Sequence, residues 1–143
     1  MAYWLFQSNP RYHRGLDAIR EQTAMPWLVT RYKSQIQVGD GVLVWIAGEA
    51  AGIYAIAEVI SLPTVLEPSQ IQDLPYWMDT SLLREEKPRC QIRFVRKLLG
   101  QPLRKLELRF DGVLRDLEVI RMPSRTNFKI TPEQWFRVHQ LKG

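Results

Sequence analysis

The chain has 143 residues, of which 45% are hydrophobic and 24% are charged, and its formal net charge is +5. This length suits one domain that can bury a sizeable core, and the apolar fraction excludes wholesale disorder. The single cysteine, Cys90, excludes an internal disulfide, and no apolar run is long enough to cross a membrane. We expect a single cytoplasmic domain over residues 1–143, without a signal peptide and without membrane contact.

Charge is distributed unevenly along the chain. Residues 1–83 carry five basic and eight acidic side chains, whereas residues 84–143 carry fifteen basic and seven acidic ones. This asymmetry suits contact with a polyanion, because each neutralised phosphate releases condensed counterions. Solvation of exposed strands and helices by Lys and Arg explains the same pattern, so charge alone leaves both interpretations open.

The first predicted element is a strand over Tyr3–Gln7. Asn9 followed by Pro10 has the residue types of a helix cap and a first helical position, which predicts a helix that ends near Gln22. Farther along, Gly39 and Gly41 predict a turn into a strand over Val42–Ile46.

A hairpin loop over Gly48–Gly52 should lead to a returning strand. Alternation in that strand places four apolar residues on one face, namely Ile53, Ala55, Ala57 and Val59. Ser61–Pro88 contains four prolines, which predicts a long irregular connection with a short helical turn within Ile71–Met78. The next strand is indicated by three alternating apolar residues, Cys90, Ile92 and Phe94.

The C-terminal helix is the clearest element. Thr131–Gln134 has the pattern of a capping box with proline at the first helical position, and Trp135, Val138 and Leu141 form its predicted packing face. Before it, Leu106–Phe110 fits a strand or a helix, and Leu117–Arg121 predicts a short extended segment. These elements indicate an α+β domain around a curled sheet or small barrel.

Residue types that carry catalysis or bind metals are not grouped in the sequence. His13, His139 and Cys90 lack the spacing of metal-ligand pairs, so we expect His13 to be solvated, His139 to lie on a helix surface and Cys90 to pack in the core. No Gly-rich phosphate loop and no Gly-x-Ser-x-Gly motif is present. We therefore expect no enzyme activity, no catalytic residues, no metal and no cofactor.

Aromatic residues on predicted loops give a positive signal. Trp27 follows a proline outside any periodic run, and Tyr76 and Trp77 lie in the long connection. Rings on loops beside basic residues can stack on an unstacked or flipped base. A position in the core is the alternative for each tryptophan, and we assign Trp4 and Trp135 to the core because strand and helix periodicity already explain them.

Four blocks of sequence, in the same order over residues 3–141, resemble the EVE domain family. They are Tyr3–Pro10, Trp27–Tyr32 followed by Gly39-Asp40, Gly52–Val59, and Thr126–Trp135. The resemblance implies a PUA-like fold related to the YTH domain, with a strongly curved β-barrel of about five to six strands and flanking helices. It also implies a non-catalytic module that takes a modified base, such as 5-methylcytosine or 5-hydroxymethylcytosine, from DNA or RNA into an aromatic-lined pocket.

The same resemblance implies the site residues. Trp27 matches the cage tryptophan of the family, and Ser8 and Asn9 match a strand end that faces the pocket. Trp45, or a residue at the end of its strand such as Ala47, matches the second wall of the pocket. The remaining expected ligand contacts match the loop that closes over the ligand, namely Arg125, Thr126, Asn127 and Phe128. The residues expected to contact the nucleic-acid backbone are Arg31, Lys33, Arg125 and Lys129. The chain departs from the family pattern where Asn9 replaces a commoner acidic residue and Ala57 replaces a frequent glycine.

Partners follow from the same resemblance. The family is coupled to restriction systems, so the implied partners are DNA or RNA with a modified base and a nuclease or restriction-system protein. One alternative is a PUA-like RNA-binding protein that contacts structured RNA mainly through its basic surface. Another is a domain that binds a free nucleotide or metabolite. A steep salt dependence without base discrimination would favour the RNA alternative, because phosphate contacts carry no sequence information.

Overall fold

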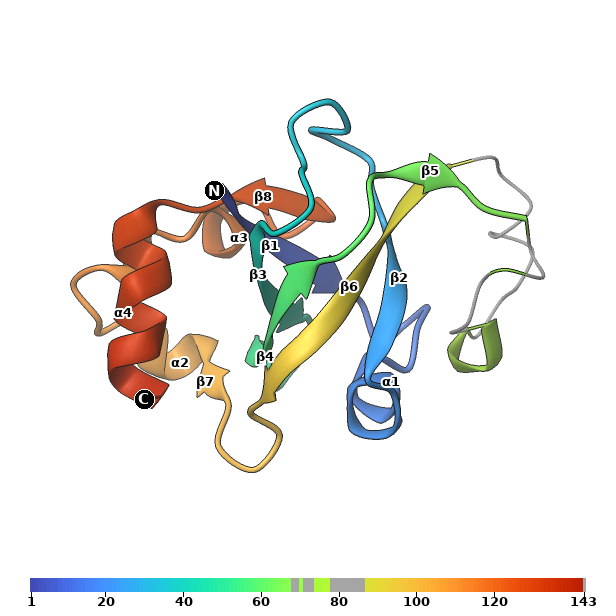
Figure 1. The fold of residues 1–143 in the computed structure, drawn as a ribbon. Coiled ribbons are helices and arrows are strands. Elements are labelled where there is room, and N and C mark those ends of the chain that lie inside the picture. The colour runs from blue at the N-terminus through green and yellow to red at the C-terminus, as the bar shows by residue number, and fades with distance from the viewer. Residues whose placement is uncertain (68–69, 71–73, 78–86, 143) are drawn as a thin grey trace.

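The computed structural model describes residues 1–67, 70, 74–77 and 87–142. Its centre is a curled mixed sheet (Figure 1), in which six strands follow the order β2-β6-β4-β3-β1-β8. Their bounds are β1 Tyr3–Ser8, β2 Ala24–Leu28, β3 Gly41–Ile46, β4 Gly52–Val59, β6 Pro88–Lys97 and β8 Asn127–Lys129. Two short strands complete it: β5, Thr64–Val65, pairs with β6, and β7, Leu103–Arg104, pairs with β4. The pair β1 and β3 is parallel and the others are antiparallel.

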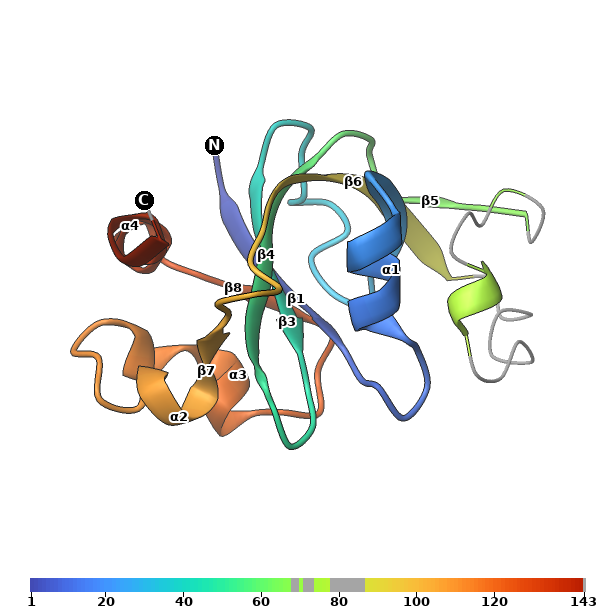
Figure 2. The ribbon, with the colours of Figure 1, turned by 90° about the horizontal axis from the view of Figure 1, so that it is seen from below.

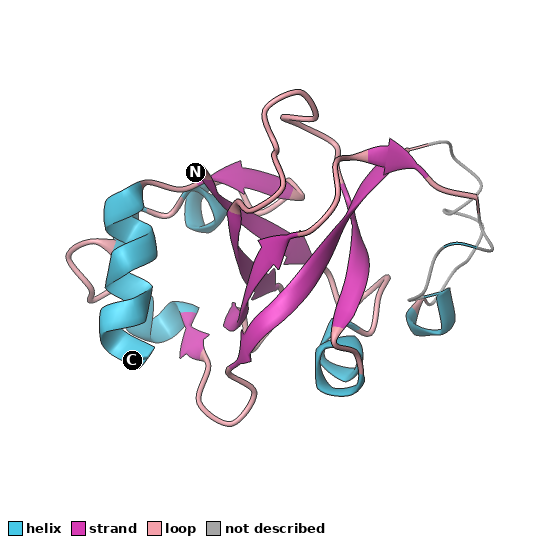
Figure 3. Ribbon diagram, in the orientation of Figure 1, coloured by secondary structure: helices cyan, strands magenta, loops and turns pink. Residues whose placement is uncertain are grey.

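Helices lie on both sides of the sheet. Their bounds are α1 Gly15–Glu21, α2 Lys105–Leu108, α3 Glu118–Arg121 and α4 Pro132–Lys142, with 3₁₀ turns η2 Leu74–Tyr76 and η4 Leu114–Asp116. Figure 2 shows α1 on one side of the sheet and α2, α3 and α4 on the other. Figure 3 colours strands and helices differently and shows the strands at the centre with the helices around them. None of the helices in the described part of the chain has the length and apolar character that a membrane crossing requires.

Strand alternation divides the interior into two hydrophobic cores. Successive residues of a strand point to opposite faces, so Trp4 and Phe6 pack in a first core with Ile19 of α1. Leu5 packs in a second core with Val138 of α4. Trp4 is 2% exposed, which confirms its assignment to the core.

The β3–β4 hairpin is confirmed, but a bulge breaks the alternation expected in β4. Val44 pairs with Ala55 and Trp45 pairs with Ile53, so Tyr54 is the extra residue. Ile53 therefore packs in the second core, while Ala55 packs in the first. The expectation that Ile53 shares a face with the following alternate residues is wrong for this reason.

The predicted first helix begins later than Asn9. The Asn9 carbonyl accepts hydrogen bonds from the backbone N–H groups of Tyr12 and His13, both at 3.0 Å, and its side chain accepts one from Arg11 N–H at 3.0 Å. Asn9 thus closes a single turn, and α1 begins at Gly15. A Cβ atom at Gly15 would lie 2.8 Å from Ile46 Cδ1, so this close approach requires glycine.

Two segments that were ambiguous or expected to be extended form short helices. Leu106–Phe110 fitted either a strand or a helix, and the structure shows the helix α2 over Lys105–Leu108. The extended segment expected over Leu117–Arg121 is wrong, because Glu118–Arg121 forms α3. This helix places Val119 in the second core beside the buried Leu117. The local sequence pattern does not reveal this burial of apolar surface.

The capping box of α4 is confirmed. Gln134 N–H donates to Thr131 Oγ1 and Thr131 N–H donates to Gln134 Oε1, both at 3.0 Å. Trp135 stacks on Tyr3, with ring centroids 4.8 Å apart, and packs partly buried against the second core. Val138 is fully buried, but Leu141 is 41% exposed, so the expected packing face is wrong at its last residue.

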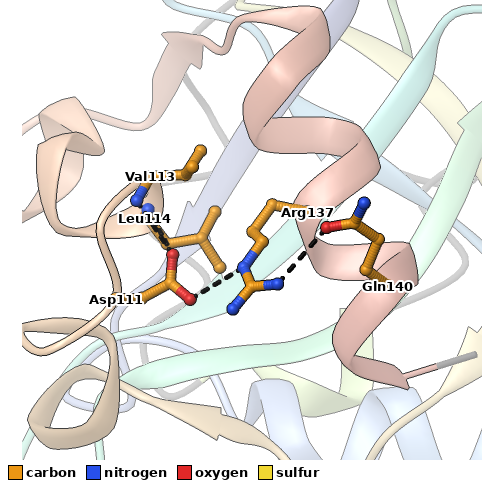
Figure 4. A network of polar contacts seen from close by, with 5 residues as sticks. All are labelled: Asp111, Val113, Leu114, Arg137 and Gln140. Atoms are coloured by element: carbon orange, nitrogen blue, oxygen red, sulfur yellow. Dashed lines mark hydrogen bonds and ion pairs between the residues drawn. The ribbon is translucent and has the colours of Figure 1, made fainter.

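An ion pair connects α4 to the turn before η4 (Figure 4). Arg137 Nε donates to Asp111 Oδ2 at 2.9 Å, and Asp111 Oδ1 accepts the backbone N–H groups of Val113 and Leu114, both at 3.0 Å. Burial acts to raise the pKa of Asp111, but these backbone donors and the Arg137 guanidinium together outweigh it and hold the pKa below its usual value. The carboxylate therefore fixes the helix to the turn.

Candidate functional site

A cavity of about 270 Å³ opens where the end of β1 approaches β2. Its wall comes from β1 and the turn that follows it, from β2, from the start of β6 and from the loop before β8. Aromatic, aliphatic, polar and basic side chains all contribute to the lining. A cavity of this volume lies at the lower end of the range of small-ligand pockets, about 300–1,000 Å³.

Aromatic side chains from three segments reach the cavity wall: Trp27, Trp77 and Tyr12. Trp27 lies on β2, is 5% exposed, and its ring centroid is 6.3 Å from that of Phe6 in a stacked arrangement. Trp27 therefore belongs to the first core and to the cavity wall at once. Tyr12, 46% exposed, stands at the rim.

Trp77 is held in place by the η2 turn. The Arg14 backbone N–H donates to Tyr76 O at 2.7 Å, and the Tyr76 hydroxyl donates to Glu21 Oε2 of α1 at 2.5 Å. The hydrogen bond to Glu21 is the main reason that the pKa of Tyr76 is raised. These bonds fix the 3₁₀ turn at Leu74–Tyr76, which confirms the short helical turn expected within Ile71–Met78.

Ser8 and His13 form a polar pair on the wall. His13 Nδ1 lies 3.1 Å from Ser8 Oγ, and the imidazole centroid lies 4.7 Å from the Trp77 ring. The expectation of a solvated His13 is wrong, since this residue is only 4% exposed. Sequence reasoning missed His13 because the partners that bury it, Ser8 and Trp77, meet it only in the folded chain.

Asn9, in contrast, is exposed at the cavity rim. Its side-chain oxygen already accepts the Arg11 N–H, so its remaining hydrogen-bonding capacity lies mainly in the amide N–H₂ group. Asn9 is thus a rim residue, while Ser8, 7% exposed, lies deeper.

All the charged residues found on the cavity wall are basic: Lys87, Arg89 and Arg125. Arg89 is 4% exposed, whereas Lys87 is exposed. Gln7 Nε2 donates to the carbonyls of Pro123 at 2.9 Å and Arg125 at 2.5 Å, which anchors the loop that carries Arg125. Within the described residues, the wall holds cations and no carboxylate.

Five of the eight expected ligand residues meet on the wall: Ser8, Asn9, Trp27, Arg125 and Thr126. The structure places the other three, Trp45, Asn127 and Phe128, away from it. Trp45 and Phe128 are buried in the second core, because each points to the sheet face opposite Phe6 and Trp27. Their side chains therefore lie apart from the five residues that meet at the cavity.

Asn127 is a structural clamp beside the cavity. Its Oδ1 accepts the Thr30 backbone N–H at 2.7 Å, and its Nδ2 donates to the Leu28 carbonyl at 3.1 Å. Asn127 is 1% exposed and thus has no surface for a ligand. It joins the end of β2 to β8 and so sets the shape of the cavity edge.

Two of the residues expected to contact the nucleic-acid backbone, Arg31 and Lys129, lie beside Tyr32, outside the cavity. The Arg31 guanidinium lies 5.3 Å from the Tyr32 ring centroid, and Lys129 Nζ lies 5.0 Å from it. Tyr32 has a φ of 64°, a strained conformation for a bulky residue. Lys33 follows on the same loop and is exposed. The structure thus brings Arg31 and Lys129 together across 98 positions of sequence.

Cys90 packs in the first core, as expected. Burial raises the pKa of its thiol to about 12, so the group stays protonated at neutral pH. Among the described residues, no three side chains of His, Cys, Asp or Glu are grouped so that they could hold a metal ion.

Comparisons with known proteins give the fold family and its structural neighbours. The family model described as EVE domain matches residues 2–141, and no curated protein sequence matches the chain. A solved structure of a protein from Pseudomonas syringae is similar at a TM-score of 0.71 and 20% identity, covering 99% of this chain and 100% of that chain. A hypothetical protein from Leishmania major is similar at a TM-score of 0.71 and 17% identity, covering 99% and 94%.

A third similar structure is human THYN1 in complex with 5-methylcytosine-containing DNA. Its TM-score is 0.68 at 14% identity, covering 99% of this chain and 97% of that chain. At these identities the likeness shows a shared fold. It confirms the expected class, a curled mixed sheet with flanking helices.

Proposed function

This chain belongs to the EVE domain family, and from that premise we propose that it is a non-catalytic module that binds a modified base in DNA or RNA. The base would be of the type of 5-methylcytosine or 5-hydroxymethylcytosine. The observation that carries the proposal is the cavity wall, which combines aromatic rings with basic side chains. Rings stack on an unpaired base and cations neutralise phosphates. The complex of human THYN1 with 5-methylcytosine-containing DNA supports base binding at the family level.

In this proposal, residues deep in the cavity contact the base and residues at its mouth contact the phosphates. Trp27 stacks on the base, and Ser8 with its partner His13 supplies polar contacts. Arg125 and Lys87 contact phosphates at the mouth of the cavity. As a binding module, the protein would act through a second protein, and a nuclease or restriction-system protein is the partner that the family resemblance implies.

Replacing Trp27 tests the stacking role. Stacking on an aromatic side chain contributes about 1–3 kcal/mol per base, so Trp27→Leu should weaken binding of a 5-methylcytosine oligonucleotide by about tenfold or more. Fluorescence anisotropy at one fixed salt concentration measures the change.

Trp45→Leu is the matched control. Trp45 is equally buried, at 2% exposure, but it packs in the second core and does not line the cavity. The control should lose stability and keep its affinity for the oligonucleotide. Equal affinities of the folded Trp27→Leu protein and the wild type would refute the stacking role.

A second candidate function is RNA binding through the basic surface. It is favoured by the convergence of Arg31 and Lys129 on Tyr32 outside the cavity. In that case affinity would fall steeply with salt and would be indifferent to base methylation, because the contacts would be to phosphates.

A further inference from the structure

Strand β2 lies at the border of the sheet, and no other strand of the described residues pairs with its outer edge. Among these residues it pairs with β6 alone, in the register Met25 with Ile92 and Trp27 with Cys90. The opposite edge of β2 faces away from the sheet. Four of its residues line the cavity, and two of them, Pro26 and Leu28, carry the argument that follows.

The hydrogen bonds at both ends of β2 show which residues face that open edge. Val29 N–H donates to Pro88 O, and Phe94 N–H donates to Thr23 O, both at 2.9 Å. In an antiparallel pair, alternate residues bond to the neighbour and those between them point away. Odd-numbered residues of β2 therefore face β6, and Pro26 and Leu28 face the open edge. Proline is tolerated in a strand where no ladder N–H is required, as at this position.

Two backbone groups of this edge remain open toward the cavity. The Leu28 carbonyl is taken by Asn127 Nδ2 at 3.1 Å. The Pro26 carbonyl and the Leu28 N–H have no partner within the described part of the chain. An acceptor and a donor thus flank Trp27 on the strand. Asn127 closes the edge beyond Leu28, so only this short stretch is open.

We infer, building on the proposed function, that the Pro26 carbonyl and the Leu28 N–H read the edge of the bound base. The carbonyl accepts from an exocyclic amino group, and the N–H donates to an unprotonated ring nitrogen or a carbonyl oxygen. Cytosines and adenines, which carry an amino group beside a ring acceptor, match this pair, and so does the edge of guanine formed by its amino group and N3. In the orientation that 5-methylcytosine adopts, thymine and uracil place a carbonyl against the Pro26 carbonyl and a ring N–H against the Leu28 N–H, which leaves both groups unpaired and is costly.

Thymine is the sharpest ligand test, because it differs from 5-methylcytosine only in this donor and acceptor pattern. Single-stranded oligonucleotides with one central 5-methylcytosine or thymine, measured at one salt concentration, avoid differences in duplex stability. The wild-type protein should bind the thymine strand about tenfold more weakly or worse, since a lost hydrogen bond to a buried group costs about 1–3 kcal/mol. Equal affinities for the two strands overturn the inference.

Leu28→Pro tests the donor in the protein. The substitution removes the Leu28 N–H and leaves the β2–β6 hydrogen bonds in place, whereas Leu28→Ala shortens the side chain and keeps the N–H. Leu28→Pro should lose the discrimination between 5-methylcytosine and thymine, and Leu28→Ala should retain it. Discrimination that survives in a folded Leu28→Pro protein contradicts the assignment.

Amide hydrogen exchange of the wild-type protein gives a readout that does not depend on folding of the variant. The Leu28 amide should exchange rapidly in the free protein and at least about tenfold more slowly in the complex with the 5-methylcytosine strand. Unchanged exchange in a saturated complex overturns the inference while base binding stands. If no strand binds at all, the proposed function itself fails.

Discussion

Asn127 shows how one residue shapes the cavity without touching a ligand. Its amide bonds the Thr30 N–H and the Leu28 carbonyl, and these groups lie 97 and 99 positions away in the sequence. It thereby fixes the end of β2, whose open edge lines the cavity. The resemblance implied that Asn127 lies in a loop that closes over a ligand, whereas the structure places it at the start of β8 with its amide bonded to Thr30 and Leu28, because nothing local reveals which partner a buried amide will find.

We expect Asn127→Ala to lower the free energy of unfolding by about 2 kcal/mol, because it leaves the Thr30 N–H and the Leu28 carbonyl without their partner. Urea denaturation measures the change. Asn9→Ala is the control: Asn9 is exposed and, among the described residues, its side chain bonds only the Arg11 N–H, so this variant should lose less stability. Comparable losses in the two variants would argue against the clamp.

The site residues differ in how far they could be predicted. Ser8, Asn9, Trp27, Arg125 and Thr126 lie on the cavity wall as the resemblance implied. Trp45 does not, since a residue at a strand position can face either core and only the three-dimensional arrangement decides which. His13 and Trp77 join the wall through tertiary contacts with each other.

At the scale of elements, the strands that alternate regularly were predictable, whereas β2 was missed, because Pro26 and the lack of alternation around Trp27 indicate a loop. The β3–β4 hairpin and β6 follow from period-two alternation and from glycine turns. The four-residue helix α3 has too few residues to show a helical period, so it was mistaken for an extended segment. The α1 start was placed early because Asn9 has the chemistry of a cap and uses it on a separate turn.

The ion pair between α4 and Asp111 gives stability a defined pH dependence. The folded-state pKa of Asp111 is lowered, so its stabilising contribution is present above the unfolded-state pKa of about 3.9 and is lost as the pH falls through the folded-state value. Asp111→Asn should lower the free energy of unfolding by about 1 kcal/mol at neutral pH. The difference from wild type should shrink as the pH falls below about 3.9 and disappear once the pH is below the folded-state pKa.

Thermal or urea unfolding across pH 2.5 to 8, a range of about five units that spans the carboxylate titration, measures this dependence. Asp17→Asn is the matched control, because Asp17 pairs with Arg20 at a more exposed position on α1. That variant should be nearly neutral. A constant difference between Asp111→Asn and wild type over the whole pH range would contradict the ion-pair explanation.

At the scale of the whole molecule, the basic C-terminal half serves two purposes. Some cations are engaged within the fold: Arg93 pairs with Glu58, Arg137 pairs with Asp111, and Lys97 Nζ donates to the Gln22 carbonyl at 2.7 Å. Others line the cavity or lie beside Tyr32, namely Lys87, Arg89, Arg125 and Lys129.

The central claim is that the cavity discriminates a modified base. Fluorescence anisotropy with matched strands carrying cytosine, 5-methylcytosine or 5-hydroxymethylcytosine, as DNA and as RNA at one fixed salt concentration, tests it most directly. We predict a preference of about tenfold or more for one modified strand, equivalent to about 1.4 kcal/mol. Equal binding to every strand would contradict base reading and favour a phosphate binder.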